Sequence, residues 1–265
     1  AALNKKYGFD KPKHLQYWMF LKNTARGDFG VSFTKKGQNV NDIIKQGFFV
    51  SAQLGVMAII FAVVGGILWG AITAKYRNKW PDYSIMVFVI MGISVPSFVF
   101  ASFAQMGIIK INEIFNLTLP YRGDGTFVSL IVPALVLGLG TMAFLTRLLR
   151  SSLLEVINSD FVKTAKSKGL SPRQIFFNHE LRNSILPVIT IIGPAIAGIT
   201  TGSFVIETIF TIPGLGKQFV EGVQQNDYTL IMGTTVFYGA FLVLMVLLVD
   251  VLYGFVDPRI QVEKS

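Results

Sequence analysis

Long apolar windows without a charged residue divide this chain into spans and connections. About 20 mostly apolar residues are enough to cross the hydrocarbon core of a bilayer. Five windows reach that length, and none of them contains Asp, Glu, Lys or Arg. The windows are 48–74, 83–109, 127–146, 183–206 and 228–249. This pattern predicts an all-α polytopic membrane protein with a transmembrane domain over residues 46–256.

The overall composition agrees with the pattern. The chain has a mean hydropathy of +0.55, with 52% hydrophobic and 15% charged residues, whereas soluble domains carry about 25% charged residues. Cysteine is absent, which excludes disulfides and thiolate chemistry in this chain. The net charge of +9 is carried by residues outside the apolar windows, so membrane topology explains it more simply than nucleic-acid binding.

The distribution of Lys and Arg predicts which side faces the cytoplasm. Connections 75–82 and 147–182 and the tail hold twelve Lys or Arg residues on one side of the membrane. The connections on the opposite side hold three, Lys110, Arg122 and Lys217. Since cytoplasmic loops carry the excess of positive residues, we expect the richer side, with the tail 257–265, to be cytoplasmic.

The segment 1–45 then lies outside the cytoplasm, although it carries nine Lys or Arg residues. A segment this basic needs a preceding helix to carry it across. We therefore expect a missing first helix and six transmembrane helices in the complete protein, with both ends cytoplasmic. The start at Ala1 instead of Met agrees with that expectation. The alternative is a five-helix protein with an inverted N-terminus.

The connection 155–182 contains a basic stretch interrupted by Gly169 and Pro172. Residues 160–168 can form one short helix, which Gly169 can end by taking a left-handed conformation. Ser171 can cap a second helix that has Pro172 at its first position. Two short helices at a fixed angle suit docking on a partner, and we name residues 163–177 the elbow. The plainer interpretation is an ordinary amphipathic loop.

Helix breakers inside the windows suggest a transport pathway. Pro96 stands between Ser94 and Ser97, and these three residues are our candidates for the pathway. Membrane helices tolerate proline where neighbours or water satisfy the freed carbonyls. The alternative is that proline is simply common in membrane helices.

Small residues and two acids also mark positions near the windows. Gly66-x-x-x-Gly70 and Gly198-x-x-x-Gly202 predict close packing between helices. Glu207 and Asp250 lie at the ends of windows, where we favour an interfacial hydrogen-bonded role over a function inside the membrane.

Signatures of catalysis are missing from the sequence. The string that ends Gly216-Lys217-Gln218 lacks the first glycine and the Ser or Thr of a P-loop. Gly138-x-Gly140-x-x-Ala143 lies inside an apolar window with no strand before it, so it does not predict a dinucleotide site. His14 and His179 are far apart and lack partners. We expect no catalytic, cofactor or metal site in this chain.

The elbow and its flanks resemble the cytoplasmic coupling loop of ABC importer permeases, in the oligopeptide/dipeptide (peptide/nickel) branch. Residues 164–170 are TAKSKGL and residues 179–187 are HELRNSILP, similar to two runs of that branch. Lys163 stands where the generic family pattern has Glu. Further similar elements follow in order along the chain: GDFGVS at 27–32, ISVPSF at 93–98, FTIPGLG at 210–216, Asp227-Tyr228, and the ending around 250–259.

The resemblance implies the first (B-type) permease chain of a type I-like importer with cytoplasmic coupling helices, in a bacterial cell membrane. It implies four kinds of partner: a homologous second permease, two ATPase subunits that bind ATP and Mg, an extracytoplasmic substrate-binding protein, and a peptide substrate. Coupling to the ATPase is then expected at nine residues of the elbow. They are Lys163, Thr164, Ala165, Lys168, Gly169, Leu170, Ser171, Pro172 and Arg173.

Three alternatives remain open at this stage. A nickel or metal-chelate importer shares the motifs, although no His or Cys cluster lies in the windows. A stand-alone secondary transporter would need charged relay residues inside its helices, and the windows have none. The third alternative is a membrane scaffold that does not transport. Whether transport requires an ATPase that binds the elbow would separate these alternatives.

Overall fold

The structure is a computed structural model that describes residues 11–35, 37–124, 126–200 and 204–256. Those ranges are helical apart from connections, and the only β-type pairing within them is an isolated bridge between Val31 and Asn39. The tail 257–265 and the first ten residues lie outside the described residues. The topology expected for 1–45 and 257–265 therefore stays a prediction.

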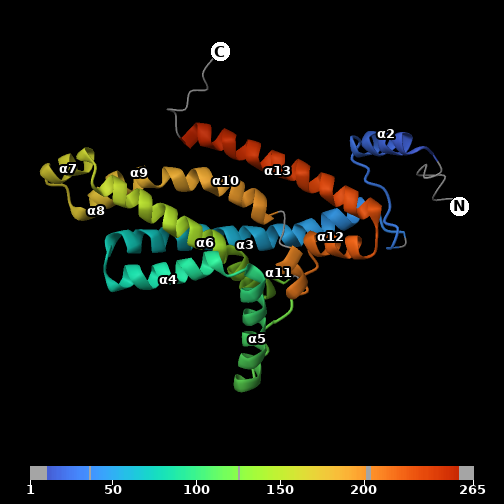
Figure 1. The fold of residues 1–265 in the computed structure, drawn as a ribbon, viewed down its shortest axis with the longest axis horizontal. Helices are drawn as coiled ribbons and strands as arrows, with labels where there is room; N and C mark the ends of the chain where they lie inside the picture. The colour runs from blue at the N-terminus through green and yellow to red at the C-terminus, as the bar shows by residue number, and fades with distance from the viewer. Residues whose placement is uncertain (1–10, 36, 125, 201–203, 257–265) are drawn as a thin grey trace, which may run out of the picture.

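Two long helices form the centre of the molecule, α3 (Val40–Lys75) and α6 (Phe127–Ile157) (Figure 1). Glycines on α3 let α6 approach closely. A Cβ added to Gly66 would lie 2.7 Å from Leu145 Cβ, and one added to Gly70 would lie 2.9 Å from Leu149 Cβ. The close packing predicted for this glycine pair is confirmed. A Cβ added to Gly198 would meet open space within the described chain, and Gly202 lies outside the described residues.

The other long helices cover opposite sides of this pair. α4 (Trp80–Ser94) packs on α3 and α6, while α10 (Leu186–Thr200) packs on α3, α6 and α13 (Tyr228–Val256). Four helices in the described ranges are long and apolar enough to cross a membrane: α3, α5 (Ser97–Phe115), α6, and α13 over Tyr228–Leu248. α4 and residues Leu186–Ile196 of α10 are apolar but shorter.

The span expected over 83–109 is two helices instead of one. α4 ends at Ser94 and α5 begins at Ser97, and Figure 1 shows α5 leaving the bundle in a different direction. The physical cause is Pro96, which has no N–H and pushes the preceding residue out of the helical region. Val95 is accordingly extended, with φ −86° and ψ 128°.

The window 183–206 is also divided. It contains most of α9 (Arg182–Ser184), all of α10 and the start of α11 (Phe204–Ile209). Residues 201–203 lie outside the described residues.

Short helices gather at the two ends of the bundle. One end, here named the α7 end, carries α7 (Asp160–Ser167), α8 (Pro172–Ile175), the π-helix η1 (Phe176–Leu181) and α9. The opposite end, here named the α12 end, carries α2 (Lys13–Thr24), α12 (Leu215–Gln224) and the first turns of α3 and α13 (Figure 1).

Candidate functional site

The elbow has the local structure that its sequence predicts. α7 ends where Gly169 takes φ +76°, and the Gly169 N–H donates to the Lys166 carbonyl at 3.0 Å. Ser171 then caps α8, because its Oγ accepts from the Gln174 N–H at 3.3 Å while Gln174 Oε1 accepts from the Ser171 N–H at 3.1 Å. Pro172 occupies the first turn of α8. The end of α7 and the start of α8 are therefore satisfied by local hydrogen bonds.

A small apolar core holds the two helices of the elbow together. Val162, Ala165 and Ile175 are buried, and Leu170 and Val156 pack against them. Among the nine expected coupling residues, Ala165 and Leu170 belong to this core, and the coupling role of all nine stays a prediction. The other seven are exposed: Lys163, Thr164, Lys168, Gly169, Ser171, Pro172 and Arg173.

Two aromatic side chains of the elbow region are exposed and were not singled out from the sequence. Phe161 is 46% exposed and Phe177 is 53% exposed. Large apolar side chains exposed among basic residues are typical of contact surfaces. The sequence does contain a signal for them, since an aromatic residue in a short polar connection is often exposed. The family pattern, however, is defined by Gly and Pro and does not include these two positions.

Electrostatics at the elbow are dominated by its basic residues. Asp160 accepts a hydrogen bond from Lys163 Nζ at 2.8 Å, and this contact lowers the pKa of Asp160 below its ordinary value. Lys166, Lys168 and Arg173 have no ion-pair partner among the described residues. The exposed surface of the elbow is therefore positive and suits an acidic or polar partner surface.

A π-helix joins the elbow to α10. η1 continues from α8 into α9 without leaving helical backbone angles. His179 lies in η1 and its backbone carbonyl accepts from Asn183 Nδ2 at 2.6 Å, while the scaffold role expected for this residue stays a prediction. The elbow is therefore joined to α10 by a nearly continuous run of helical backbone.

A buried ion pair lies near the same end. Arg150 on α6 donates through Nε and Nη2 to the two carboxylate oxygens of Asp82 on α4, at 2.8 and 2.7 Å. Asp82 is 2% exposed and also accepts from the Asn78 N–H at 2.9 Å. The pair fixes the start of α4 against α6, a few turns before α6 leads into the elbow.

A second cluster lies at the α12 end, around Glu207. This side chain is fully buried and accepts hydrogen bonds from Ser51 Oγ at 2.7 Å and from the Lys217 N–H at 2.9 Å. Ser51 Oγ in turn accepts from the Leu215 N–H at 2.8 Å. Glu207 and Ser51 therefore satisfy N–H groups in the first turn of α12. The hydrogen-bonded role expected for Glu207 is confirmed, while the Asp250 side chain lies outside the described residues.

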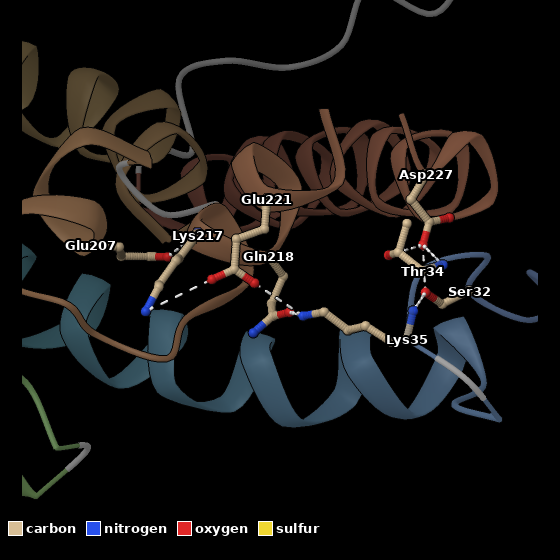
Figure 2. A network of polar contacts seen from close by, with 8 residues as sticks. All are labelled: Ser32, Thr34, Lys35, Glu207, Lys217, Gln218, Glu221 and Asp227. Carbon is tan, nitrogen blue, oxygen red and sulfur yellow. Dashed lines mark hydrogen bonds and ion pairs between the residues drawn. The ribbon is translucent and has the colours of Figure 1, made fainter. Parts of the chain in front are cut away.

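Residues 28–35 and 37–39, here named the clasp, lie over the same end of the bundle. Asp227, directly before α13, accepts from Ser32 Oγ and from the Thr34 N–H and Oγ, the last at 2.9 Å. Lys35 Nζ reaches across to Gln218 and to Glu221 of α12, the latter at 3.1 Å. Figure 2 shows these contacts as two adjacent groups that join the clasp to α12 and α13.

The clasp brings together elements that are far apart in the chain. The GDFGVS element contributes Ser32, the FTIPGLG element leads into α12, and Asp227 begins the helix that follows. Burial of Asp227 alone would raise its pKa, but hydrogen bonds from Ser32, Leu230, Phe33 and Thr34 together lower its pKa below the ordinary value.

The three pathway candidates lie together at the joint between α4 and α5. Ser94, Pro96 and Ser97 are all exposed in the structure. Their role stays a prediction, since exposure alone does not distinguish a lipid-facing surface from a pathway.

Comparison with known families decides the class of protein. Residues 66–262 match the family model described as binding-protein-dependent transport system inner membrane component. The chain belongs to this family. The structure and the family agree on a multi-pass membrane protein, since this family is named for the inner membrane and the described helices include four of spanning length.

Relatives within the binding-protein-dependent family cover nearly the whole chain. The chain is 45% identical over 262 residues to the dipeptide transport system permease protein DppB of Bacillus subtilis, with 98% of this chain and 83% of the relative covered. It is 42% identical over 263 residues to the oligopeptide transport system permease protein OppB of Haemophilus influenzae, with 98% and 85% covered.

Solved structures of ABC transporters share the fold. An inward-facing methionine ABC transporter superposes with a TM-score of 0.65 at 17% identity, covering 81% of this chain and 96% of that chain. An amino acid ABC transporter superposes with a TM-score of 0.64 at 12% identity, covering 80% and 93%. The ABC importer permease fold expected from the sequence is confirmed.

Proposed function

We propose that this chain is the membrane subunit of an ATP-driven importer that carries peptides into a bacterial cell. Its relatives are named as dipeptide and oligopeptide permeases, which favours peptides over nickel or a metal chelate. With a homologous second permease the chain would form the pathway, with Ser94, Pro96 and Ser97 as candidate lining residues. A substrate-binding protein would deliver the peptide at the α12 end.

The elbow is the observation that carries this proposal. Its two helices pack around a small apolar core of their own, and the start of α8 is capped by hydrogen bonds. We therefore propose that the elbow moves as one rigid body. Exposed Phe161 and Phe177 beside unpaired basic residues offer an apolar and positive surface to a partner. In the proposed mechanism, ATPase subunits that hold ATP and Mg dock there, and ATP hydrolysis takes place entirely on those subunits.

Motion at the elbow would then switch the bundle between two states. η1 and α9 connect the elbow to α10, and α6 connects it to the central helix pair. A rigid element that pulls on both could change which end of the pathway is open. Nucleotide must favour one of the two states, since a ligand with equal affinity for both shifts nothing. The α7 end and the C-terminus are accordingly proposed to be cytoplasmic.

Affinity purification in mild detergent tests the proposal. The wild-type chain should recover an ATP-hydrolysing subunit and a second permease. Phe161→Asp/Phe177→Asp should lose the ATPase and keep the permease, because only the elbow surface changes. The matched control is Tyr17→Asp/Trp18→Asp on α2, where two exposed aromatics lie outside the membrane spans and at the other end of the bundle, and it should keep the ATPase. A chain that is purified alone and still transports would favour a secondary carrier.

A further inference from the structure

A pocket lies between α2, the first residues of the clasp and the start of α13, away from the elbow. Its volume is about 260 Å³. Figure 1 shows α2 beside the α12 end of α13. The walls combine apolar and charged side chains, among them Met19, Phe20, Phe29, Met232, Lys13 and Asp28. No residue of α2 is buried, so the pocket separates this helix from a tight contact with the bundle.

The pocket carries one charge of each sign. Asp28 accepts from the Gly30 N–H through Oδ1 at 2.9 Å, which leaves Oδ2 without a partner among the described residues. Lys13 has no ion-pair partner in the same part of the chain. A ligand with a phosphate near an ammonium group would match both side chains.

The pocket lies at the depth of lipid headgroups. The apolar window that forms α13 is residues 228–249, which rise about 33 Å at 1.5 Å per residue, close to the hydrocarbon thickness of about 30 Å. The first turn of α13, with Thr229, is therefore at the membrane surface. Tyr17 and Trp18 of α2 are mostly exposed beside it, as aromatic residues at a bilayer interface are.

An exposed apolar stripe leads from the pocket along α13. Met232 lines the pocket, and Val236, Val243 and Leu247 follow it at helical spacing on the same face. All four side chains are exposed. An acyl chain could lie along this stripe while its headgroup occupies the pocket.

We propose that the pocket binds the headgroup of a zwitterionic phospholipid that carries a primary amine, phosphatidylethanolamine. Lys13 binds the phosphate and Asp28 binds the ammonium group. One acyl chain lies on the α13 stripe. The lipid thereby fills the space between α2 and α13 and fastens α2 to the bundle. This inference depends on the membrane spans and is independent of what is transported.

Lipid retention by the purified transport complex tests the proposal. After delipidation the complex is incubated with equal amounts of phosphatidylethanolamine, phosphatidylcholine and phosphatidylglycerol, and retained lipids are measured by native mass spectrometry. The wild type should retain phosphatidylethanolamine preferentially. Lys13→Glu should lower its affinity about tenfold, equivalent to about 1.4 kcal/mol. Asp28→Asn should abolish the preference over phosphatidylcholine, which lacks ammonium N–H donors.

A matched control keeps the test decisive. Lys22→Glu changes the same charge on the same helix but lies outside the pocket wall, and it should retain the lipid as the wild type does. Asp28→Asn keeps the size of its side chain, so it tests the headgroup contact even if Lys13→Glu fails to fold. Equal retention of all three lipids by the wild type would overturn the proposal. Displacement of the lipid by a soluble dipeptide would also overturn it and would assign the pocket to peptide.

Discussion

Arg150 and Asp82 meet in a two-point ion pair, with Nε to Oδ1 at 2.8 Å and Nη2 to Oδ2 at 2.7 Å. The pair joins the start of α4 to α6 close to the place where α6 leads into the elbow. Asp82→Ala should lower the free energy of unfolding by about 3 kcal/mol, because it leaves a partly buried guanidinium without its partner. The melting temperature of the purified complex measures this change.

Two controls accompany the Asp82 variant. Asp160→Ala removes the exposed partner of Lys163 and should leave the melting temperature unchanged, because exposed ion pairs contribute little. The double variant Asp82→Leu/Arg150→Met should recover part of the lost stability. Equal melting of Asp82→Ala and wild type would show that the pair does not hold α4 in place.

Phe177 gives a direct test of where the ATPase docks. The chain has no cysteine, so a single Phe177→Cys variant carries one defined attachment point. We expect a short bifunctional crosslinker at this position to join the chain to the ATPase subunit. Asp124→Cys, exposed just before the start of α6 and separated from the elbow by the length of that helix, should give no such product. A crosslink from Asp124→Cys but not from Phe177→Cys would place the ATPase at the wrong end for this account.

Ser51 and Glu207 should hold the first turn of α12. Ser51→Ala removes the acceptor of the Leu215 N–H and the donor to Glu207. Hydrogen exchange of the amides at 215–217 should accelerate about fivefold, since one hydrogen bond contributes about 1 kcal/mol. Ser84→Ala is the matched control, because Ser84 bonds only to the carbonyl one turn earlier on α4. Unchanged exchange in Ser51→Ala would mean that α12 is held by other contacts.

The clasp should weaken at acid pH through Asp227. Its pKa is lowered in the folded state, so its contribution to stability is present at neutral pH and is lost as pH falls from the ordinary value of 3.8 through the lowered folded-state pKa. Asp227→Asn should therefore melt below the wild type at pH 7, and this difference should shrink below pH 4. A difference that stays constant across this range would show that the carboxylate charge does not matter.

Local signals in the sequence were enough to predict the elbow. Gly169 ends α7, while Ser171 and Pro172 begin α8. Whether a helix ends or begins at such a residue depends mainly on its neighbours in the sequence, so these boundaries could be predicted. The long helices α3 and α6 were predictable for a similar reason, because apolar length alone indicates a span.

Contacts between distant residues could not be predicted in this way. Asp82 and Arg150 are separated by 68 positions, and Ser32 and Asp227 by 195. No local pattern indicates that such residues meet, since their pairing depends on how the helices assemble. The division at Pro96 was visible as a helix breaker, but whether a proline kinks a membrane helix or ends it depends on its neighbours.

The central claim, that the elbow transmits motion from an ATPase, is tested most directly by ATP-driven peptide uptake into proteoliposomes. Gly169 has φ +76°, which proline cannot adopt and asparagine tolerates. The account predicts that Gly169→Pro assembles in the membrane but loses uptake, while Gly169→Asn keeps most of it. Wild-type uptake by an assembled Gly169→Pro complex would contradict the claim.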